Sequence, residues 1–225
     1  MRCRYCHNPD SWGHGAGASA SAKLMEVGEL LDKAERFRSY WGEPGANGKP
    51  LGGITVSGGE PLLQIDFLIE LFREAQRRKI STCLDTAGQP YTSASPFAHK
   101  FTELMSLTDT VMLDIKHTDT EQHKRLTGQP NANIIECARR IDELGVDLWL
   151  RHVLVPGWTD SDDNLVAIRH LADSLSHLRK IEVLPYHTMA QFKYEKLGIP
   201  YQLKGVPQPT PEQVAHAEQI LGCAH

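Results

Sequence analysis

Two cysteines, Cys3 and Cys6, stand near the start of the chain, separated by two residues. Thiolates at this spacing can provide two corners of a metal or iron–sulfur site. The same spacing also occurs in redox pairs and by chance, so the pair alone leaves these alternatives open. Asn8 and Pro9 follow the pair. Because the residue before a proline avoids the helical region, the chain is expected to leave the cysteines in an extended segment or a turn.

Polar residues and glycines also follow several short apolar runs farther along the chain. Apolar, β-branched runs of this kind are typical of buried strands. In folds built on parallel strands, active sites lie at the carboxyl ends of the strands. We therefore expect five polar groups to converge on one site: Gly58, Gly59 and Glu60; Asp85 and Thr86; Asp114 and Lys116; Arg151 and Val153; and His187.

The types of these residues suggest particular ligands. Gly58 and Gly59 let the backbone approach a charged small ligand closely, although an ordinary turn between a strand and a helix fits the spacing equally well. Asp85 and Asp114, with Thr86 and the backbone of Met112, could bind a hard cation through oxygen ligands. Either aspartate could instead cap a helix, so both interpretations stay open.

Lys116 and Arg151 place two positive charges at the same predicted rim. Together they suit a carboxylate or a ribose, whereas each taken alone is more typical of a surface salt bridge. His187 follows a predicted strand in a Leu-Pro-Tyr-His stretch, and a purely structural histidine is the alternative there. We expect substitution of Lys116 or His187 to weaken ligand binding while leaving folding nearly unchanged.

The elements that must position these residues alternate between strand and helix, which is the pattern of parallel βαβ units. Loops are predicted over 11–23, which is rich in glycine, alanine and serine, and over 42–53. The first helix is expected to carry Phe37 on its apolar face. Predicted strands cover 54–56, 81–84, 110–113, 146–155 and 180–184, and predicted helices cover 26–40, 64–78, 96–106, 121–126, 133–144, 162–176, 189–197 and 211–221.

Composition narrows the class of protein. The chain has 225 residues, 40% of them hydrophobic and 23% charged, which fits a single α/β domain. A formal net charge of -4 argues against a nucleic-acid binder, and no apolar run is long enough to span a membrane. The cysteines number five, an odd count that favours reduced thiols and a cytoplasmic location. Cys83 and Cys137 are expected to be buried small side chains, and Cys223 to be incidental.

Five motifs in order resemble one known family. They are Cys-Arg-Tyr-Cys-His-Asn at 3–8, Cys-Leu-Asp-Thr at 83–86, Val-Met-Leu-Asp-Ile-Lys at 111–116, Val-Pro-Gly-Trp at 155–158 and Lys-Ile-Glu-Val-Leu-Pro-Tyr-His at 180–187. Together they resemble the pyruvate formate-lyase activating enzymes among the radical S-adenosylmethionine enzymes. Relatives that activate other glycyl-radical enzymes often carry extra cysteines after the first motif, and residues 9–57 contain none.

The resemblance implies a fold and an activity. The fold would be a partial, open (β/α)6-type TIM-like barrel with parallel strands, formed by one domain over residues 1–225. A 4Fe–4S cluster, reduced by flavodoxin or ferredoxin, would cleave S-adenosylmethionine to a deoxyadenosyl radical. That radical would take a hydrogen atom from a glycine of pyruvate formate-lyase under anaerobic conditions. The enzyme is expected to be a cytoplasmic monomer.

The resemblance also implies roles for individual residues. Cys3 and Cys6 match two of the three cluster ligands, and a monovalent cation would be held by Asp85, Thr86, Met112 and Asp114. The catalytic residues would be Cys3, Cys6, Lys116 and His187. The S-adenosylmethionine site would be lined by Tyr5, Cys6, His7, Gly58, Gly59, Asp114, Ile115, Lys116, Arg151, Val153 and His187.

One feature departs from the family pattern. The first cysteine of the cluster motif should lie four positions before Cys3, a position that falls before Met1. We therefore expect the chain to be an N-terminally shortened form that lacks this cysteine and the first strand of the barrel. Three alternatives stay open: an activating enzyme for another glycyl-radical enzyme, a radical enzyme acting on a small molecule, and a non-catalytic barrel that binds zinc or no metal.

Overall fold

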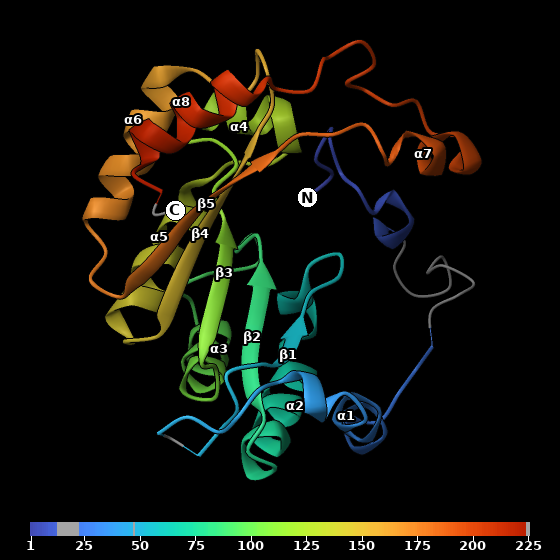
Figure 1. The fold of residues 1–225 in the computed structure, drawn as a ribbon, viewed down its shortest axis with the longest axis vertical. Helices are drawn as coiled ribbons and strands as arrows, with labels where there is room; N and C mark the ends of the chain where they lie inside the picture. Colours follow the sequence, from blue (N-terminus) through green and yellow to red (C-terminus); the bar gives the residue numbers. More distant parts are fainter. Residues whose placement is uncertain (13–22, 47, 224–225) are drawn as a thin grey trace.

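The computed structural model describes residues 1–12, 23–46 and 48–223 (Figure 1). Its centre is a five-stranded sheet with the strand order β1-β2-β3-β4-β5, and every pair of neighbouring strands is parallel. The strands are β1 (Gly53–Val56), β2 (Ser81–Thr86), β3 (Thr110–Asp114), β4 (Asp147–Leu154) and β5 (Leu178–Pro185). The prediction of an α/β fold with one open, barrel-like sheet of parallel strands is confirmed.

The predicted helices are present, some with shifted ends. Figure 1 shows α2, α3, α5, α6 and α8 along the outer side of the curved sheet, while α7 lies with the N-terminal segment at its open side. The α-helices are α1 (Val27–Glu35), α2 (Ile65–Arg77), α3 (Phe97–Ser106), α4 (Thr120–Thr127), α5 (Ala132–Glu143), α6 (Asp162–Asp173), α7 (Gln191–Leu197) and α8 (Pro211–Leu221). Short 3₁₀ helices are η1 (Pro9–Trp12), η3 (Arg38–Tyr40) and η4 (Pro61–Gln64).

The first helix is shorter than predicted, and its predicted apolar face is wrong at Phe37. The helix ends at Glu35 and the chain tightens into η3. This turn leaves Phe37 61% exposed and buries Trp41 at 8% exposure. The backbone carbonyl of Trp41 accepts a hydrogen bond from the N–H of Gly52 at 2.8 Å, which anchors it beside β1. Of the predicted loop 11–23, residues 13–22 lie outside the described part of the chain.

The core forms because side chains alternate between the two faces of each strand. In β2 and β4, every second residue is buried. Leu84, Leu148 and Leu150 face the outer helices, where α2 presents Leu68 and Phe72. The other face of the same strands carries polar side chains and becomes the inner surface of the sheet. A second apolar cluster lies near one rim and comprises Cys3, Tyr5, Leu126, Val155, Tyr186 and Leu203.

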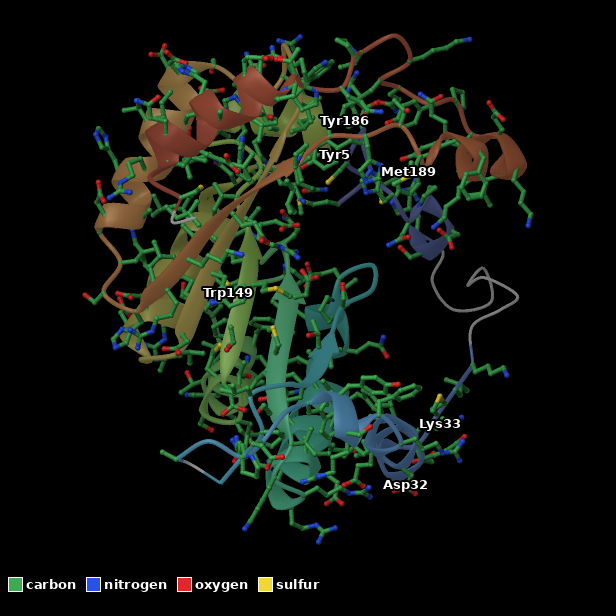
Figure 2. All side chains as sticks on the ribbon, viewed as in Figure 1. Tyr5, Asp32, Lys33, Trp149, Tyr186 and Met189 are labelled. Atoms are coloured by element: carbon green, nitrogen blue, oxygen red, sulfur yellow. The ribbon has the colours of Figure 1, made fainter. Side chains whose placement is uncertain are left out.

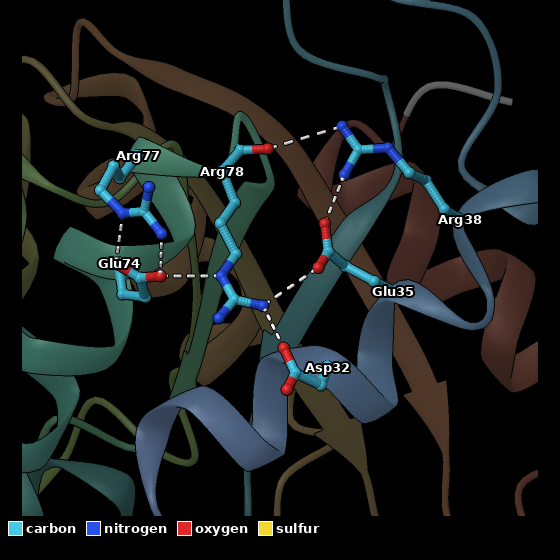
Figure 3. Close-up of polar contacts among 6 residues, drawn as sticks. All are labelled: Asp32, Glu35, Arg38, Glu74, Arg77 and Arg78. Carbon is cyan, nitrogen blue, oxygen red and sulfur yellow. Dashed lines mark hydrogen bonds and ion pairs between the residues drawn. The ribbon is translucent and has the colours of Figure 1, made fainter.

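An ion-pair network joins α1 to the end of α2, away from the polar strand ends (Figure 3). Arg78 donates to Asp32 at 2.6 Å, to Glu35 at 3.0 Å and to Glu74 at 2.8 Å. Arg38 also contacts Glu35, at 3.0 Å. These pairs connect α1 and the turn that follows it with the end of α2. Among the described residues, no helix combines the length and the apolar character needed to cross a membrane.

Candidate active site

Three charged residues from neighbouring strands meet on the inner face of the sheet. Asp114 is in register with Arg151, and Asp85 is in register with Met112 one strand away. Arg151 donates through Nε to Asp114 at 3.0 Å and through Nη1 to Asp85 at 3.1 Å, and its Nη2 contacts both carboxylates. Arg151 lies inside β4, not at its end as predicted. Its long side chain reaches across β3, so the guanidinium group lies between the two carboxylates.

Lys116 follows β3 and is buried, with 7% of its surface exposed. Its Nζ donates to Asp114 Oδ2 at 3.0 Å and lies 5.5 Å from the centre of the Tyr5 ring. Burial opposes the charge on Lys116, but Asp114 beside it holds the pKa of Lys116 well above its usual value. Burial likewise opposes the charge on Asp114, but Lys116 and Arg151 outweigh it and lower the pKa of Asp114. Two carboxylates and two cations thus form a compact, charge-balanced group.

The predicted cation ligands are distributed over both faces of the sheet. The carboxylates of Asp85 and Asp114 face the inner surface and are shared with Arg151. The hydroxyl of Thr86 is buried on the other face, where it donates to Glu60 Oε1 at 2.5 Å. A monovalent cation would therefore share the aspartates with the guanidinium group, and the cation site stays a prediction.

Cys3 and Cys6 lie in one turn, in which the N–H of Cys6 donates to the carbonyl of Cys3 at 3.0 Å. The N–H groups of Arg2 and Arg4 donate to the backbone carbonyls of Thr127 and Leu126 at the end of α4, at 3.1 and 3.0 Å. The hydroxyl of Tyr194 in α7 donates to the carbonyl of Cys6 at 3.0 Å. These bonds hold the cysteine turn beside the carboxyl end of β3, and Figure 2 places Tyr5 and Tyr186 together at this rim.

The thiols fit a three-thiolate cluster only in part. Among the residues that the structure describes, no three histidines, cysteines or acidic residues are placed to hold a metal ion together. Cys137 is buried in the core, as predicted. Cys83 is only partly buried, contrary to the prediction, because it lies on the same face of β2 as Asp85. Cys3 and Cys6 therefore stay predicted cluster ligands.

His187, two positions after β5, meets the cysteine turn through His7. The two imidazole rings stack with centroids 4.0 Å apart and planes inclined by 19°. The Nε2 of His7 also lies 3.4 Å from the carbonyl oxygen of His187. Burial and the neighbouring His187 lower the pKa of His7. Among the described residues, no polar atom pairs with the buried Nδ1 of His187.

The loop from Gly58 to Glu60 crosses the end of β1. Gly58 has a φ of +148°, a conformation that favours glycine, and a Cβ atom at this position would meet no atom within 4 Å. Glu60 accepts hydrogen bonds from the N–H of Leu62 at 3.1 Å, the N–H of Ala87 at 3.0 Å and the hydroxyl of Thr86. The loop is thus tied to the end of β2 while Gly58 faces open space.

Two residues predicted to line a cofactor have surroundings that the sequence did not indicate. Ile115 is buried with 1% of its surface exposed, and its N–H donates to the carbonyl of Arg151 at 2.9 Å. Val153 packs against the apolar cluster that contains Cys3 and Tyr5. Sequence reasoning missed Tyr194, because no local pattern connects a tyrosine of α7 to a cysteine turn at the start of the chain.

Comparisons with known proteins agree with this geometry. The model of the radical SAM superfamily matches residues 1–167. A pyruvate formate-lyase-activating enzyme of Streptococcus mutans is 44% identical over 221 residues, covering 98% of this chain and 80% of the relative. A pyruvate formate-lyase-activating enzyme of Staphylococcus aureus is 41% identical, covering 98% of this chain and 84% of the relative. One of Listeria monocytogenes is 39% identical, covering 98% of this chain and 85% of the relative.

Solved structures give the same likeness. A domain of the pyruvate formate-lyase-activating enzyme from Bacteroides vulgatus superposes with a TM-score of 0.62 at 26% identity, covering 76% of this chain and 93% of that one. A radical SAM methyltransferase from Sphaerobacter thermophilus has a TM-score of 0.59 at 19% identity, covering 87% of this chain and 53% of that one. At this identity the second likeness concerns the fold alone.

Proposed function

The chain belongs to the radical SAM superfamily and, within it, to the pyruvate formate-lyase-activating enzymes, and from this membership we propose that it generates a glycyl radical on a pyruvate formate-lyase. The family implies a 4Fe–4S cluster and S-adenosylmethionine as its cofactors. The proposed substrate is thus a protein, and the reacting group is a glycine of that protein.

One observation in the structure supports this proposal most directly. The cysteine turn packs over the carboxyl end of β3, where the ring of Tyr5 lies 5.5 Å from Lys116 Nζ. Lys116 in turn binds Asp114, which binds Arg151. Thiols for a cluster and charged groups for a small zwitterionic ligand are therefore adjacent, as chemistry on S-adenosylmethionine requires.

The family suggests roles for the surrounding residues. Lys116 and Arg151 supply positive charge for the carboxylate of S-adenosylmethionine, and the backbone at Gly58 and Gly59 accommodates its amino group. His7 and His187, whose rings stack on each other, are proposed to contact the cofactor from the rim. Asp85 and Asp114 balance the two cations and, with Thr86 and Met112, are the proposed monovalent cation ligands.

Only two cluster ligands can be proposed among the described residues. Cys3 and Cys6 are proposed cluster ligands, and a third thiolate is not among the described residues. No electron-transfer step is therefore assigned to particular atoms of this chain. We also propose reduced flavodoxin or ferredoxin as the electron donor, a monomeric state and a cytoplasmic location.

The test is radical formation on the partner protein. The chain, incubated anaerobically with iron and sulfide, is mixed with pyruvate formate-lyase, S-adenosylmethionine and reduced flavodoxin. We expect the electron paramagnetic resonance signal of a glycyl radical, absent without S-adenosylmethionine and in the Cys6→Ala variant. A signal obtained only with a different glycyl-radical enzyme would reassign the partner. No signal with any such enzyme, from chains that iron and sulfide analysis shows to hold a full cluster, would contradict the proposed activity.

A further inference from the structure

His152 lies next to Arg151 in β4 but faces the opposite side of the sheet, because successive side chains of a strand alternate. Its ring is buried, with 1% of the residue exposed. Nδ1 lies 2.8 Å from the carbonyl oxygen of Ile115, and Nε2 lies 3.1 Å from the carbonyl oxygen of Thr159. One imidazole ring therefore faces two hydrogen-bond acceptors.

The surroundings of the ring decide which of its two nitrogens carries the proton. Burial lowers the pKa of His152 and outweighs its two carbonyl contacts, which favours a neutral ring with one proton. The carbonyl of Thr159 already accepts a hydrogen bond from Asn164 Nδ2 at 2.9 Å. The carbonyl of Ile115 accepts from no other group among the described residues. With the proton on Nδ1, each carbonyl has a donor, Ile115 from His152 and Thr159 from Asn164, although the unprotonated Nε2 then faces the Thr159 oxygen without a hydrogen bond. With the proton on Nε2, the buried carbonyl of Ile115 would have no donor.

The hydrogen bond to Ile115 acts on the segment that carries the charged residues of the site. Ile115 stands between Asp114 and Lys116, and its own N–H donates to the carbonyl of Arg151 at 2.9 Å. Both backbone polar groups of Ile115 are thus held by consecutive residues of β4. The pair of bonds fixes the backbone from which Asp114 and Lys116 extend toward the inner surface of the sheet.

Two buried asparagines extend the same restraint along the chain. Asn131 Nδ2 donates to the carbonyl of His117 at 3.0 Å and to that of Thr118 at 2.6 Å. Asn164 Oδ1 accepts from the N–H of Thr118 at 2.9 Å, and the same side chain donates to Thr159. Hydrogen bonds with these two buried side chains therefore hold the connection after β3.

We propose that His152 is a positioning residue for the S-adenosylmethionine site, acting through the hydrogen bond from its Nδ1–H to the Ile115 carbonyl. This inference rests on the proposed function, because it assigns Lys116 and Asp114 to that ligand. His152 and Arg151 act as a pair: Arg151 binds the side chain of Asp114 from the inner face, and His152 holds the backbone of Ile115 from the outer face.

The first test needs no cofactor. The ¹⁵N chemical shifts of the His152 ring in the uniformly labelled chain identify which nitrogen carries the proton. We expect one slowly exchanging proton on Nδ1 near neutral pH. A ring protonated on Nε2, or a ring in rapid exchange between the two forms, would overturn the proposal.

The second test uses two substitutions that separate the ring nitrogens. An asparagine amide reaches about as far as Nδ1, and a glutamine amide about as far as Nε2, so His152→Asn keeps the bond to Ile115 and His152→Gln loses it. Thr82→Val is the matched control, because Thr82 is a buried side chain that donates to the carbonyl of Leu107 at 2.9 Å at the other end of the sheet.

Thermal midpoint, amide hydrogen exchange and the dissociation constant for S-adenosylmethionine are measured for each variant. In His152→Gln we expect faster exchange at the amides of Ile115 and Thr118 and a dissociation constant raised about tenfold. In His152→Asn the constant stays within about twofold, and in Thr82→Val only the thermal midpoint falls. If both His152 variants bind S-adenosylmethionine equally weakly, or if the dissociation constant follows the thermal midpoint in all three variants, the positioning role is refuted.

If the parent chain binds no S-adenosylmethionine, the proposed function fails. The ring shifts and amide exchange then still decide whether His152 fixes the Ile115 segment.

Discussion

The imidazole ring of His7 stacks on that of His187, with a centroid separation of 4.0 Å. His7 belongs to the cysteine turn and His187 to the segment after β5, so the contact joins the two ends of the site. Each ring also lies near a group that binding would use, since Cys6 precedes His7 and the Nδ1 of His187 is unpaired among the described residues. A ligand that contacts both the thiols and the strand ends would therefore lie beside the stacked rings of His7 and His187.

Replacing His187 tests its contribution to binding separately from its contribution to folding. In His187→Ala we expect weaker binding of S-adenosylmethionine and a free energy of unfolding lowered by no more than about 1 kcal/mol, the loss of one stacked ring pair. Calorimetric titration and thermal unfolding give the two quantities. His99→Ala, on the exposed side of α3, should change neither. Unchanged affinity in His187→Ala would exclude this residue from the site.

Lys116 should matter for folding as well as for binding, which corrects the expectation drawn from the sequence. Its side chain is 8% exposed and pairs with an Asp114 side chain that is 19% exposed. Removing one partner leaves a buried charge less well compensated, so Lys116→Ala should lower the free energy of unfolding by about 2 kcal/mol or more. Arg151 still binds Asp114, which limits the loss. Lys180→Ala removes a more exposed pair with Glu182 and should change stability by less than about 1 kcal/mol.

The carboxylate of Asp114 predicts how the free energy of unfolding depends on pH in the acid range. The pKa of Asp114 is lowered in the folded state, so its contribution is fully present above the unfolded pKa of about 3.9 and is lost as pH falls through the lower folded value. Denaturant unfolding measured from pH 6 down to about pH 3 should show this loss in the parent chain. In Asp114→Asn the slope should be shallower, whereas Asp66→Asn, at an exposed position, should keep the parent slope. If the free energy of unfolding changes with pH equally in all three proteins, Asp114 is not the source of the acid dependence.

Glu60 is predicted to hold the glycine loop through its carboxylate. In Glu60→Gln, one side-chain oxygen becomes an NH₂ group that cannot accept a hydrogen bond. Oε1 accepts from Thr86 and Leu62 and Oε2 accepts from Ala87, so at least one of these bonds is lost. We expect a loss of about 1–3 kcal/mol in the free energy of unfolding, together with weaker binding of S-adenosylmethionine.

The matched control for the Glu60 substitution is Glu70→Gln, at an exposed position of α2. This variant should behave like the parent chain in both measurements. If Glu60→Gln binds S-adenosylmethionine normally in spite of a lower stability, the carboxylate supports the fold without shaping the loop for the ligand.

The sequence by itself determined the alternation of strands and helices and the placement of polar residues near strand ends. Both depend on short-range patterns, since apolar spacing distinguishes a strand from a helix and glycine or proline marks where each ends. The same patterns led to the family, because its motifs are short and follow one another in order. Local pattern was misleading at Phe37, where helical spacing continued past the point at which the chain turns to bury Trp41.

Only the tertiary structure decided which side chains are partners. Arg151 could have been a surface cation, and the register between β3 and β4 is what places its guanidinium group against Asp114. The bond from Tyr194 to Cys6 and the bond from His152 to Ile115 likewise join residues far apart in the chain. Spacing along the sequence carries no information about such pairs, because they are set by how strands align and how distant segments pack, and a hydrogen bond requires atoms to approach within about 3 Å.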